Sequence, residues 1–226
     1  MQIAPRIKDK ETQVVIENGA KYAVDPEDGQ KTGFYSDQRD NRMIIRNIAS
    51  GKSVLDTFCY SGGFSVNAAL GGAKRVVSVD SSQPALDTAQ KNLQLNNVEN
   101  VVQLIKADAL DAMKSLLTNN EQFDIVICDP PKLAPTRASL DRAKSKYIKI
   151  NTLGMSLVKP GGLLMTCTCS AAMTQSGEFR KMLMESAQKA KRDITILSST
   201  GPGLDHPVHI AYPEGEYLTA VLVCVS

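Results

Sequence analysis

From Val54 onward, short apolar stretches rich in β-branched residues alternate with longer amphipathic stretches. The apolar stretches are "SVLDTF", "RVVSVD", "VVQLIKAD" and "FDIVICD", and each is followed by a segment with apolar residues at helical spacing. This alternation is typical of βαβ units, in which helices cover both faces of a mostly parallel sheet. The sequence therefore predicts a Rossmann-like α/β fold. Ligands of such folds bind at the carboxyl ends of the strands.

The segments on either side of this pattern add a hairpin and further elements. Two β-rich runs flank Asn18-Gly19, the pair that favours a type I′ turn, so we expect a hairpin. A helix is expected behind a cap at Asp37. Later come a helix over Leu140–Val158, a strand in "LLMTCTC", a helix near 177–191 and strands in "ITILSS" and "EYLTAVLVCV". We predict a β-hairpin extension over 1–36 and one Rossmann-like domain over 37–226.

Composition narrows the class of protein without naming a partner. Apolar residues make up 42% of the chain and the net charge is +2, as in an ordinary globular protein. The five cysteines are scattered through strand-like runs, which does not resemble a secreted disulfide framework. The amino terminus has no apolar signal region, and no stretch approaches 18 apolar residues. We expect a cytoplasmic protein, with an organellar stroma or matrix as the alternative, and no membrane span.

A glycine-rich turn follows the first predicted strand, in "VLDTFCYSGGFS". Gly62 and Gly63 allow a ligand to approach the backbone, and the next helix begins with unpaired N–H groups. The dinucleotide fingerprint G-x-G-x-x-G and the P-loop ending are absent from this turn. A pyrophosphate ligand is therefore disfavoured.

Acidic residues end the first three strands of the pattern. Asp56 would repel a phosphate and suit a cationic amino-acid group. Asp80 lies about 20 residues beyond the glycine turn, where a carboxylate can bind both ribose hydroxyls, and Asp108 is placed to accept from an adenine amino group. The three acids together describe a nucleoside ligand with an amino-acid tail and no phosphate, and S-adenosylmethionine fits this description best. The alternative for each aspartate taken singly is a helix cap.

The fourth strand end is the sharpest signal. In "FDIVICDPPK", Asp129 leaves a buried strand and enters Pro130-Pro131, which stiffen the loop so that a polar group projects at the sheet edge. A rigid turn without chemistry is the alternative. Amine methyltransferases usually carry an aromatic residue after the prolines, where this chain has Lys132.

At this point the chain resembles the class I RNA methyltransferases that form 5-methylcytosine in large-subunit ribosomal RNA. The matching blocks are "KTGFYSDQR", "DTFCYSGGF", "VVSVDSSQPAL", "DIVICDPPK", "TCS", "DHP" and "YPEGEYL". The resemblance implies a class I methyltransferase sheet and S-adenosylmethionine as cofactor. It also implies a cofactor pocket made by Asp56, Tyr60, Ser61, Gly62, Gly63, Phe64, Asp80, Ser81, Asp108, Ala109 and Asp129, with Gln38 in a block that packs over it.

This chain departs from the family pattern at two places. The family usually has an N-terminal PUA domain, and we expect none here because about fifty residues precede the first Rossmann strand. Family members also tend to carry an aromatic residue after "DPPK", where this chain has Leu133.

The resemblance also assigns chemistry to one cysteine. Cytosine C5 is a poor nucleophile, and a thiolate that adds to C6 activates it. Cys169, in "TCS", matches the family's cysteine block and is our candidate nucleophile, with Asp129 binding the N3/N4 edge of the base. Cys167 lies deeper in the strand and is expected in the core. A packed thiol is the alternative for Cys169; a metal site is not expected, because the chain has two histidines and no C-x-x-C.

A basic stretch follows the fourth strand end and suggests the partner. We predict that this stretch forms a phosphate-binding surface, called the basic lip, with Tyr147 as a stacking residue. The alternative is a solvated helix face. The basic residues of the stretch are Lys132, Arg137, Arg142, Lys144, Lys146 and Lys149. We expect RNA, large-subunit ribosomal RNA first, and a homodimer. The alternatives are a guanine-N7 or amine methyltransferase, or a catalytically silent RNA-binding module.

Overall fold

One seven-stranded sheet forms the centre of the molecule in the computed structural model, which describes residues 13–24, 34–133, 140–212 and 215–226. The strand order is β5, β4, β3, β6, β7, β9, β8, and β9 runs antiparallel to both of its neighbours. The mostly parallel sheet predicted from the sequence is confirmed. The strands are β3 (Ser53–Thr57), β4 (Arg75–Asp80), β5 (Val102–Lys106), β6 (Phe123–Cys128), β7 (Val158–Thr168), β8 (Ile194–Thr200) and β9 (Thr219–Val225).

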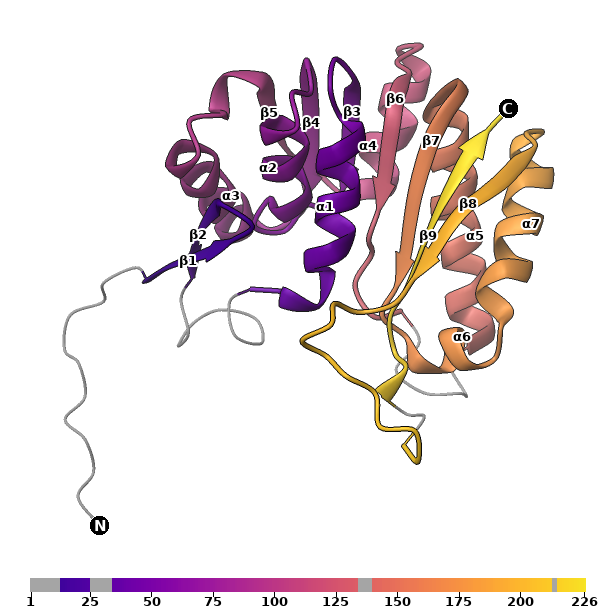
Figure 1. Cartoon of the computed structure of the whole chain (residues 1–226). Helices are drawn as coiled ribbons and strands as arrows, with labels where there is room; N and C mark the ends of the chain where they lie inside the picture. Colours follow the sequence, from indigo (N-terminus) through magenta and orange to yellow (C-terminus); the bar gives the residue numbers. More distant parts are fainter. Residues whose placement is uncertain (1–12, 25–33, 134–139, 213–214) are drawn as a thin grey trace.

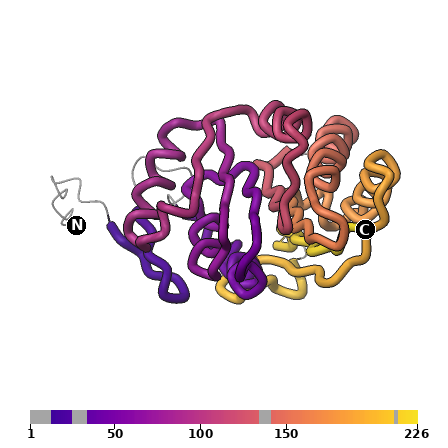
Figure 2. The backbone as a smooth tube through the Cα atoms, turned by 90° about the horizontal axis from the view of Figure 1, so that it is seen from above, coloured from indigo at the N-terminus to yellow at the C-terminus, as the bar shows by residue number. Residues whose placement is uncertain are grey.

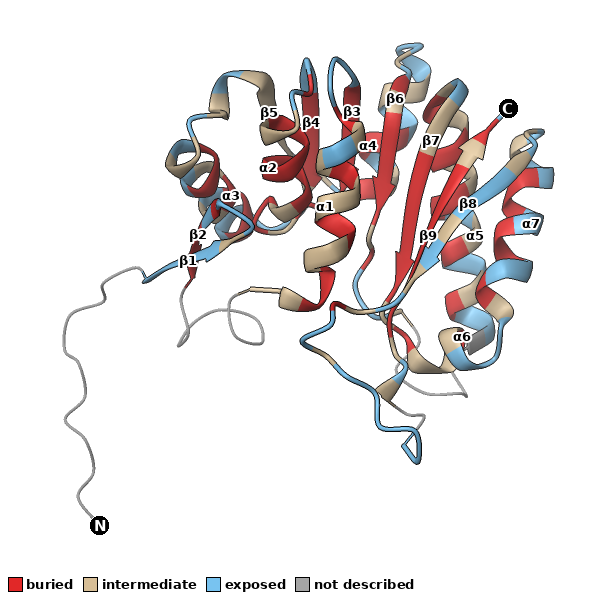
Figure 3. Cartoon of the chain, in the orientation of Figure 1, coloured by how far each residue is buried: buried red, intermediate tan, exposed pale blue. Residues whose placement is uncertain are grey.

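Helices cover both faces of this sheet (Figure 1). Apolar side chains of α4, α5 and α7 pack on one face, and those of α1 and α2 pack on the other beside α3. The α-helices are α1 (Arg39–Ile48), α2 (Gly63–Leu70), α3 (Gln83–Leu95), α4 (Ala109–Thr118), α5 (Leu140–Leu157), α6 (Ala171–Gln175) and α7 (Glu178–Ala190). The central strands are buried along most of their length (Figure 3) because both faces are covered.

The N-terminal hairpin lies at one end of the molecule, opposite the C-terminal helices (Figure 2). Its strands β1 (Gln13–Glu17) and β2 (Ala20–Val24) are antiparallel, and Asn18 and Gly19 have φ of 49° and 78°. Two consecutive positive φ values are those of the predicted type I′ turn. Tyr22 is buried against α2 and accepts a 2.7 Å hydrogen bond from Asn67. The division of the chain at residue 36 stays a prediction.

The start of α1 differs from the expectation. A 3-10 turn over Ser36–Gln38 precedes the helix, so Gln38 occupies the cap position and makes no side-chain cap bond. The predicted cap at Asp37 is wrong, because Asp37 is inside that turn and its Oδ2 accepts a 2.8 Å hydrogen bond from the Tyr217 hydroxyl. The side chains of Asp37 and Gln38 therefore bond to other parts of the chain and do not cap α1.

The long helix and the strand after it show how much the pattern predicts. Helix α5 ends at Leu157, one residue before the expected end. Strand β7 begins at once and includes the Pro-Gly-Gly segment, where Gly161 has φ of 76° and the pairing with β6 shifts register. The sequence predicts a strand that starts at Leu163, because a Pro-Gly pair is typical of a turn. The structure corrects this start to Val158. No helix in the described part of the chain is long and apolar enough to cross a membrane.

Candidate active site

The predicted site residues follow five neighbouring strands at one edge of the sheet. Their order across the sheet is β5, β4, β3, β6 and β7, and the chain reverses direction across the sheet between β3 and β6. That reversal is the position where parallel α/β sheets bind ligands. The sheet thus gathers there Asp108 (after β5), Asp80 (β4), Tyr60 to Phe64 (after β3), Asp129 (after β6) and Cys169 (after β7).

The turn after β3 is held in unusual backbone conformations. Phe58 and Tyr60 have positive φ of 62° and 49°, which non-glycine residues rarely adopt. Gly62 has φ of 78°, and a Cβ there would lie 3.2 Å from the Cβ of Ala89. Strain of this kind persists only where surrounding structure fixes it. The shape of the turn is therefore fixed by its neighbours, and the missing side chain of Gly62 makes room for Ala89 of α3.

One buried side chain links this turn to the N-terminal hairpin. Asn92 of α3 donates to the Ser61 carbonyl at 2.8 Å and accepts from the Ala23 N–H at 2.7 Å. The hairpin therefore supports the glycine turn directly. Sequence reasoning missed Asn92, although a polar residue beside the apolar positions of α3 is a detectable signal.

Asp80 fixes the same turn from β4. Its Oδ2 accepts from the Tyr60 N–H at 2.9 Å, and its Oδ1 accepts from the Ser82 N–H at 2.8 Å. Each carboxylate oxygen has a second acceptor position, so these bonds leave the predicted ribose contact open. Ser81, next to Asp80, is exposed.

Asp108 serves as the N-cap of α4. Its Oδ1 accepts from the N–H groups of Leu110 and Asp111 at 2.9 and 3.2 Å. The helix-cap alternative that the sequence left open is thus realised, while the adenine contact stays a prediction. Ala109 begins the helix and is buried.

Asp56 is a buried carboxyl with one oxygen engaged. Its Oδ2 accepts from the Ser65 hydroxyl at 2.5 Å, and that hydroxyl also lies 2.7 Å from Ser78 Oγ. Its Oδ1 has no hydrogen-bond partner among the described residues. Burial raises the pKa of Asp56 to about 7, with the charges of Asp129 and Asp80 adding to it against the Ser65 bond. An orphaned carboxyl oxygen below the glycine turn fits the cationic amino-acid end of S-adenosylmethionine.

Asp129 is held by the cap residue of α1. Gln38 donates from Nε2 to Asp129 Oδ2 at 3.1 Å, although 91 residues separate the two in the sequence. Burial raises the pKa of the Cys167 thiol, and a hydrogen bond with Gln38 opposes part of that rise. Gln38 therefore contacts the catalytic candidate Asp129, and its predicted place over the cofactor pocket stays a prediction.

The cysteines differ in exposure. Cys59, Cys128 and Cys167 are buried, and burial raises the pKa of Cys128 to about 12 and that of Cys167 well above its usual value. The expected core position of Cys167 is confirmed. Cys169 is partly exposed, two residues further along the same strand end. No cluster of three metal-ligating side chains occurs among the described residues.

The turn that carries Cys169 is braced from α5. Thr168 Oγ1 accepts from the Ser170 N–H at 3.2 Å and shares a 2.7 Å hydrogen bond with the Tyr147 hydroxyl. Tyr147 is fully buried and packs edge-on against Phe179. The prediction that Tyr147 stacks on RNA is wrong, because its ring belongs to the apolar face of α5.

Two further tyrosines lie near Cys169. Burial raises the pKa of Tyr35, and nearby charges that include Cys169 and Asp129 add to the effect. The pKa of Tyr217 is also raised, by burial, by its bond to Asp37 and by Cys169. Tyr35 packs edge-on against Tyr60 with ring centroids 5.2 Å apart. Tyr35 and Tyr217 both lie in the family-like sequence blocks "KTGFYSDQR" and "YPEGEYL". The blocks do not indicate that these side chains lie close to Cys169.

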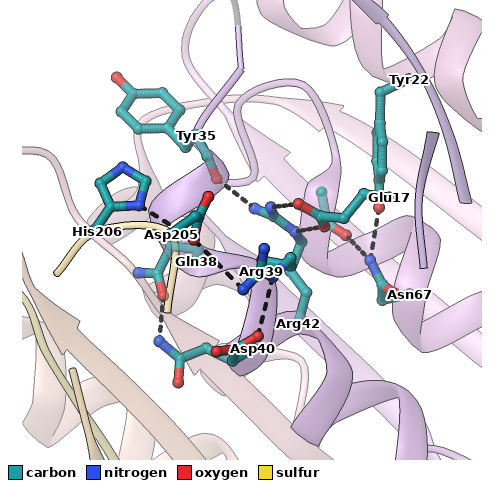
Figure 4. A network of polar contacts seen from close by, with 12 residues as sticks. Glu17, Tyr22, Tyr35, Gln38, Arg39, Asp40, Arg42, Asn67, Asp205 and His206 are labelled. Carbon is teal, nitrogen blue, oxygen red and sulfur yellow. Dashed lines mark hydrogen bonds and ion pairs between the residues drawn. The ribbon is translucent and has the colours of Figure 1, made fainter. Parts of the chain in front are cut away.

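Ion pairs connect α1 to its surroundings (Figure 4). Arg42 makes two parallel bonds to Glu17, at 2.8 and 2.7 Å, and both side chains are less than one-tenth exposed. Arg39 pairs with Asp205, whose Oδ1 lies 3.3 Å from His206 Nδ1. The "DHP" block thus contacts α1. His206 lies beside the Asp205 carboxylate, and this contact assigns it no part in the reaction.

The basic lip is partly assembled. Lys132, Arg142, Lys146 and Lys149 are exposed, whereas Lys144 pairs with Glu178 at 2.7 Å. Arg137 lies outside the described residues. A phosphate-binding role for the exposed residues stays a prediction.

Comparison with known proteins identifies the family. Residues 7–196 match the model of the S-adenosylmethionine-dependent methyltransferase family. The chain is 44% identical over 214 residues to a ribosomal RNA large subunit methyltransferase I of Aeromonas salmonicida, and 45% identical over 206 residues to that of Photobacterium profundum. These alignments cover 94% and 90% of this chain and 54% and 51% of the relatives. The chain thus spans about half the length of these curated relatives.

Solved structures agree with the fold. A protein of Streptococcus mutans assigned as a SAM-dependent methyltransferase superposes with a TM-score of 0.84 at 29% identity, covering 99% of this chain and 56% of that one. A methyltransferase solved in complex with SAH gives a TM-score of 0.83 at 29% identity, covering 96% and 57%. These likenesses confirm the methyltransferase sheet and the predicted cofactor, S-adenosylmethionine.

Proposed function

The chain belongs to the family of S-adenosylmethionine-dependent methyltransferases, and from this premise we propose that it methylates C5 of a cytosine in large-subunit ribosomal RNA. The curated relatives are named for methylation of that RNA, and this chain aligns with half of their length. The site supports cytosine C5 as the acceptor, because a cysteine and a carboxylate end neighbouring strands.

The observation that carries the proposal is the position of Cys169. Two of the described cysteines are partly exposed, Cys169 and Cys224. Cys224 pairs with Leu163, midway along β7, whereas Cys169 directly follows the carboxyl end of that strand at Thr168. The accessible thiol at the ligand-binding edge is therefore Cys169, next to the loop of Asp129.

The chemistry needs a nucleophile and a group that stabilises charge on the ring. The Cys169 thiolate forms a bond from sulfur to C6, and the C5=C6 electron pair becomes available at C5. Asp129 binds the N3/N4 edge and stabilises the protonated ring nitrogen. When bound, S-adenosylmethionine supplies the methyl group to C5 and leaves as S-adenosylhomocysteine. Loss of the C5 proton to a base then breaks the sulfur–C6 bond and restores the thiolate of Cys169.

The residues that would hold the cofactor surround the glycine turn. Asp56 offers its orphaned Oδ1 to the amino-acid end, and Asp80 offers its remaining acceptor positions to the ribose. Gly62 and Gly63 are proposed to face the cofactor through their backbone, because a Cβ at either glycine would lie against Ala89 or Arg42. Asp108 and Ala109 are proposed at the adenine end.

Bisulfite sequencing of large-subunit ribosomal RNA tests the proposal. The RNA is incubated with S-adenosylmethionine and either the wild type, Cys169→Ala or the matched control Cys224→Ala. We expect one protected cytosine with the wild type and the control, and none with Cys169→Ala. Calorimetry with S-adenosylmethionine should give the same affinity for all three proteins.

Two outcomes would contradict the proposal and indicate the alternatives. Methylation at guanine N7 or at an exocyclic amine, retained in Cys169→Ala, would make the cysteine incidental. Cofactor binding without methyl transfer to intact ribosomal RNA would leave an RNA-binding module.

A further inference from the structure

A chain of buried amides connects the end of β8 to Asp129. Thr200 donates to Asn41 Oδ1 at 2.6 Å, Asn41 donates from Nδ2 to Gln38 Oε1 at 2.6 Å, and Gln38 donates from Nε2 to Asp129. Gln38 and Asn41 are almost completely buried. Asn41 is 159 residues from Thr200 and Gln38 is 91 residues from Asp129, so the packing of α1 against the sheet creates the chain.

The direction of these hydrogen bonds is fixed by their surroundings. Asn41 Nδ2 also faces the Gly201 carbonyl at 3.5 Å, and a carbonyl oxygen can only accept. Reversing the Asn41 amide would place its oxygen against two acceptors, Gly201 O and Gln38 Oε1. Reversing both amides would place Gln38 Oε1 against the Asp129 carboxyl. Each reversal costs a buried acceptor pair, so the direction shown is the stable one.

We propose that Gln38 and Asn41 are positioning residues that hold the Asp129 carboxylate, with Oδ2 as the acceptor, in place to bind the base. The inference rests on the proposed function in that Asp129 is the group that binds the base. Gln38 touches Asp129 directly, and Asn41 acts through Gln38 by fixing which end of its amide faces the carboxyl.

Acidic neighbours disfavour the charged form of Asp129. The titratable groups coupled to it include Asp56 on β3, Tyr35 ahead of α1, Cys128 on β6, Tyr147 on α5 and Cys167 on β7. All of these groups are acids, and the nearest lysine along the chain, Lys132, is exposed. A neutral amide N–H that bonds the carboxylate favours its ionised form without adding a cation that would repel the protonated base.

A carboxyl titration tests the proposal without RNA or cofactor. The protein carries ¹³C-labelled aspartate, and the signal of Asp129 is assigned by its loss in Asp129→Asn. In Gln38→Met, which keeps the length of the side chain, we expect the titration midpoint of Asp129 to move to higher pH by about one unit. Asn41→Leu should move it in the same direction, and the exposed control Gln94→Met should not.

Two kinetic readouts separate positioning from cofactor binding. In Gln38→Met we expect kcat to fall about tenfold, the acid limb of the pH profile to move to higher pH, and the affinity for S-adenosylmethionine to stay unchanged. A midpoint that does not move in Gln38→Met would overturn the proposal. Cofactor affinity that falls in proportion to methyl transfer would also overturn it and make Gln38 a cofactor residue.

The two proposals fail separately. The carboxyl titration uses the protein alone, so its result stands whether or not bisulfite sequencing finds a methylated cytosine. Far-ultraviolet circular dichroism checks the fold of each variant. If Asn41→Leu does not fold, Gln38→Met still decides the outcome.

Discussion

Two aspartates on neighbouring strands behave in opposite ways. Asp56 lies one residue before the carboxyl end of β3, and Asp124 lies one residue after the amino end of β6. Asp124 Oδ2 accepts from the Ser53 N–H and hydroxyl at 2.8 and 2.7 Å, and its Oδ1 accepts from Lys159 at 2.9 Å. The protein thus engages both oxygens of Asp124 and one oxygen of Asp56.

The titration of the two groups follows from this difference. Burial alone would raise the pKa of Asp124, but the bonds from Ser53 and Lys159 outweigh it and hold the pKa well below its usual range. Burial raises the pKa of Asp56 to about 7 because bonds from Ser65 alone oppose it. At the amino edge of the sheet, the hydrogen bonds of Asp124 are thus satisfied within the protein. At the carboxyl edge, Asp56 keeps one acceptor oxygen for a ligand. Stability should depend on the first edge and activity on the second.

The largest expected effect is the loss of activity in Cys169→Ala. Without the nucleophile, methyl transfer should fall by at least about 10³-fold. The free energy of unfolding should change by less than about 1 kcal/mol, because the side chain is partly exposed and small. Radiolabelled methyl transfer and urea unfolding measure the two quantities. A variant that loses stability along with activity would contradict the separation of the two edges.

The second prediction concerns the pH dependence of stability in Asp56→Asn. With a folded pKa near 7 and an unfolded value near 3.8, Asp56 binds a proton in the folded state that the unfolded chain has released. The wild type therefore loses stability from this group as pH rises from about 4 to 7. The asparagine variant does not, so its stability relative to the wild type should rise by about 3 kcal/mol over that range.

Urea unfolding at several pH values measures this difference. The exposed control Asp87→Asn should show a difference that does not change with pH. A flat difference for Asp56→Asn as well would mean that Asp56 is ionised in the folded protein like an ordinary surface carboxyl.

The third prediction concerns Asp124, at the amino edge of the sheet. Asp124→Ala removes three hydrogen bonds to a charged group and should cost about 2 kcal/mol, or about 4–8 °C in Tm. Because the folded pKa of Asp124 is lowered, its contribution is present above pH 4 and disappears as pH falls below that value. The cost of the variant should shrink in acid, opposite to the trend for Asp56→Asn.

A control and an activity assay complete this test. Asp141→Ala, at a side chain that is 97% exposed, should leave Tm unchanged. Asp124→Ala should keep the kcat of the wild type at 25 °C. A large loss of kcat without a loss of stability would show that the amino edge also serves the reaction.

The sequence predicts what depends on local patterns. Alternating strands and helices, the type I′ turn at Asn18-Gly19, the glycine turn and the acidic strand ends are all encoded within a few residues of one another. Because parallel strands place their carboxyl ends at one edge, the gathering of Asp80, Asp129 and Cys169 followed from the fold class.

The rest depends on contacts across long stretches of chain. Tyr217 bonds Asp37 across 180 residues, and Thr200 bonds Asn41 across 159. A helix-cap pattern assigned Asp37 to a local role, and a basic amphipathic stretch assigned Tyr147 to RNA. Each assignment failed because a tertiary partner took the side chain, and such partners are invisible to a periodicity argument.

The smallest predicted effect concerns that buried tyrosine. Tyr147→Phe keeps the edge-on contact with Phe179 but removes the hydrogen bond to Thr168, which should cost about 1 kcal/mol of stability. Thr168 still accepts from the Ser170 N–H, so the turn that carries Cys169 loosens without opening. We expect a few-fold loss of kcat with unchanged cofactor affinity, whereas Tyr212→Phe at an exposed ring should change neither. A hundredfold loss of kcat would mean that the Tyr147 hydroxyl takes part in the reaction. The active site would then include a buried side chain of α5.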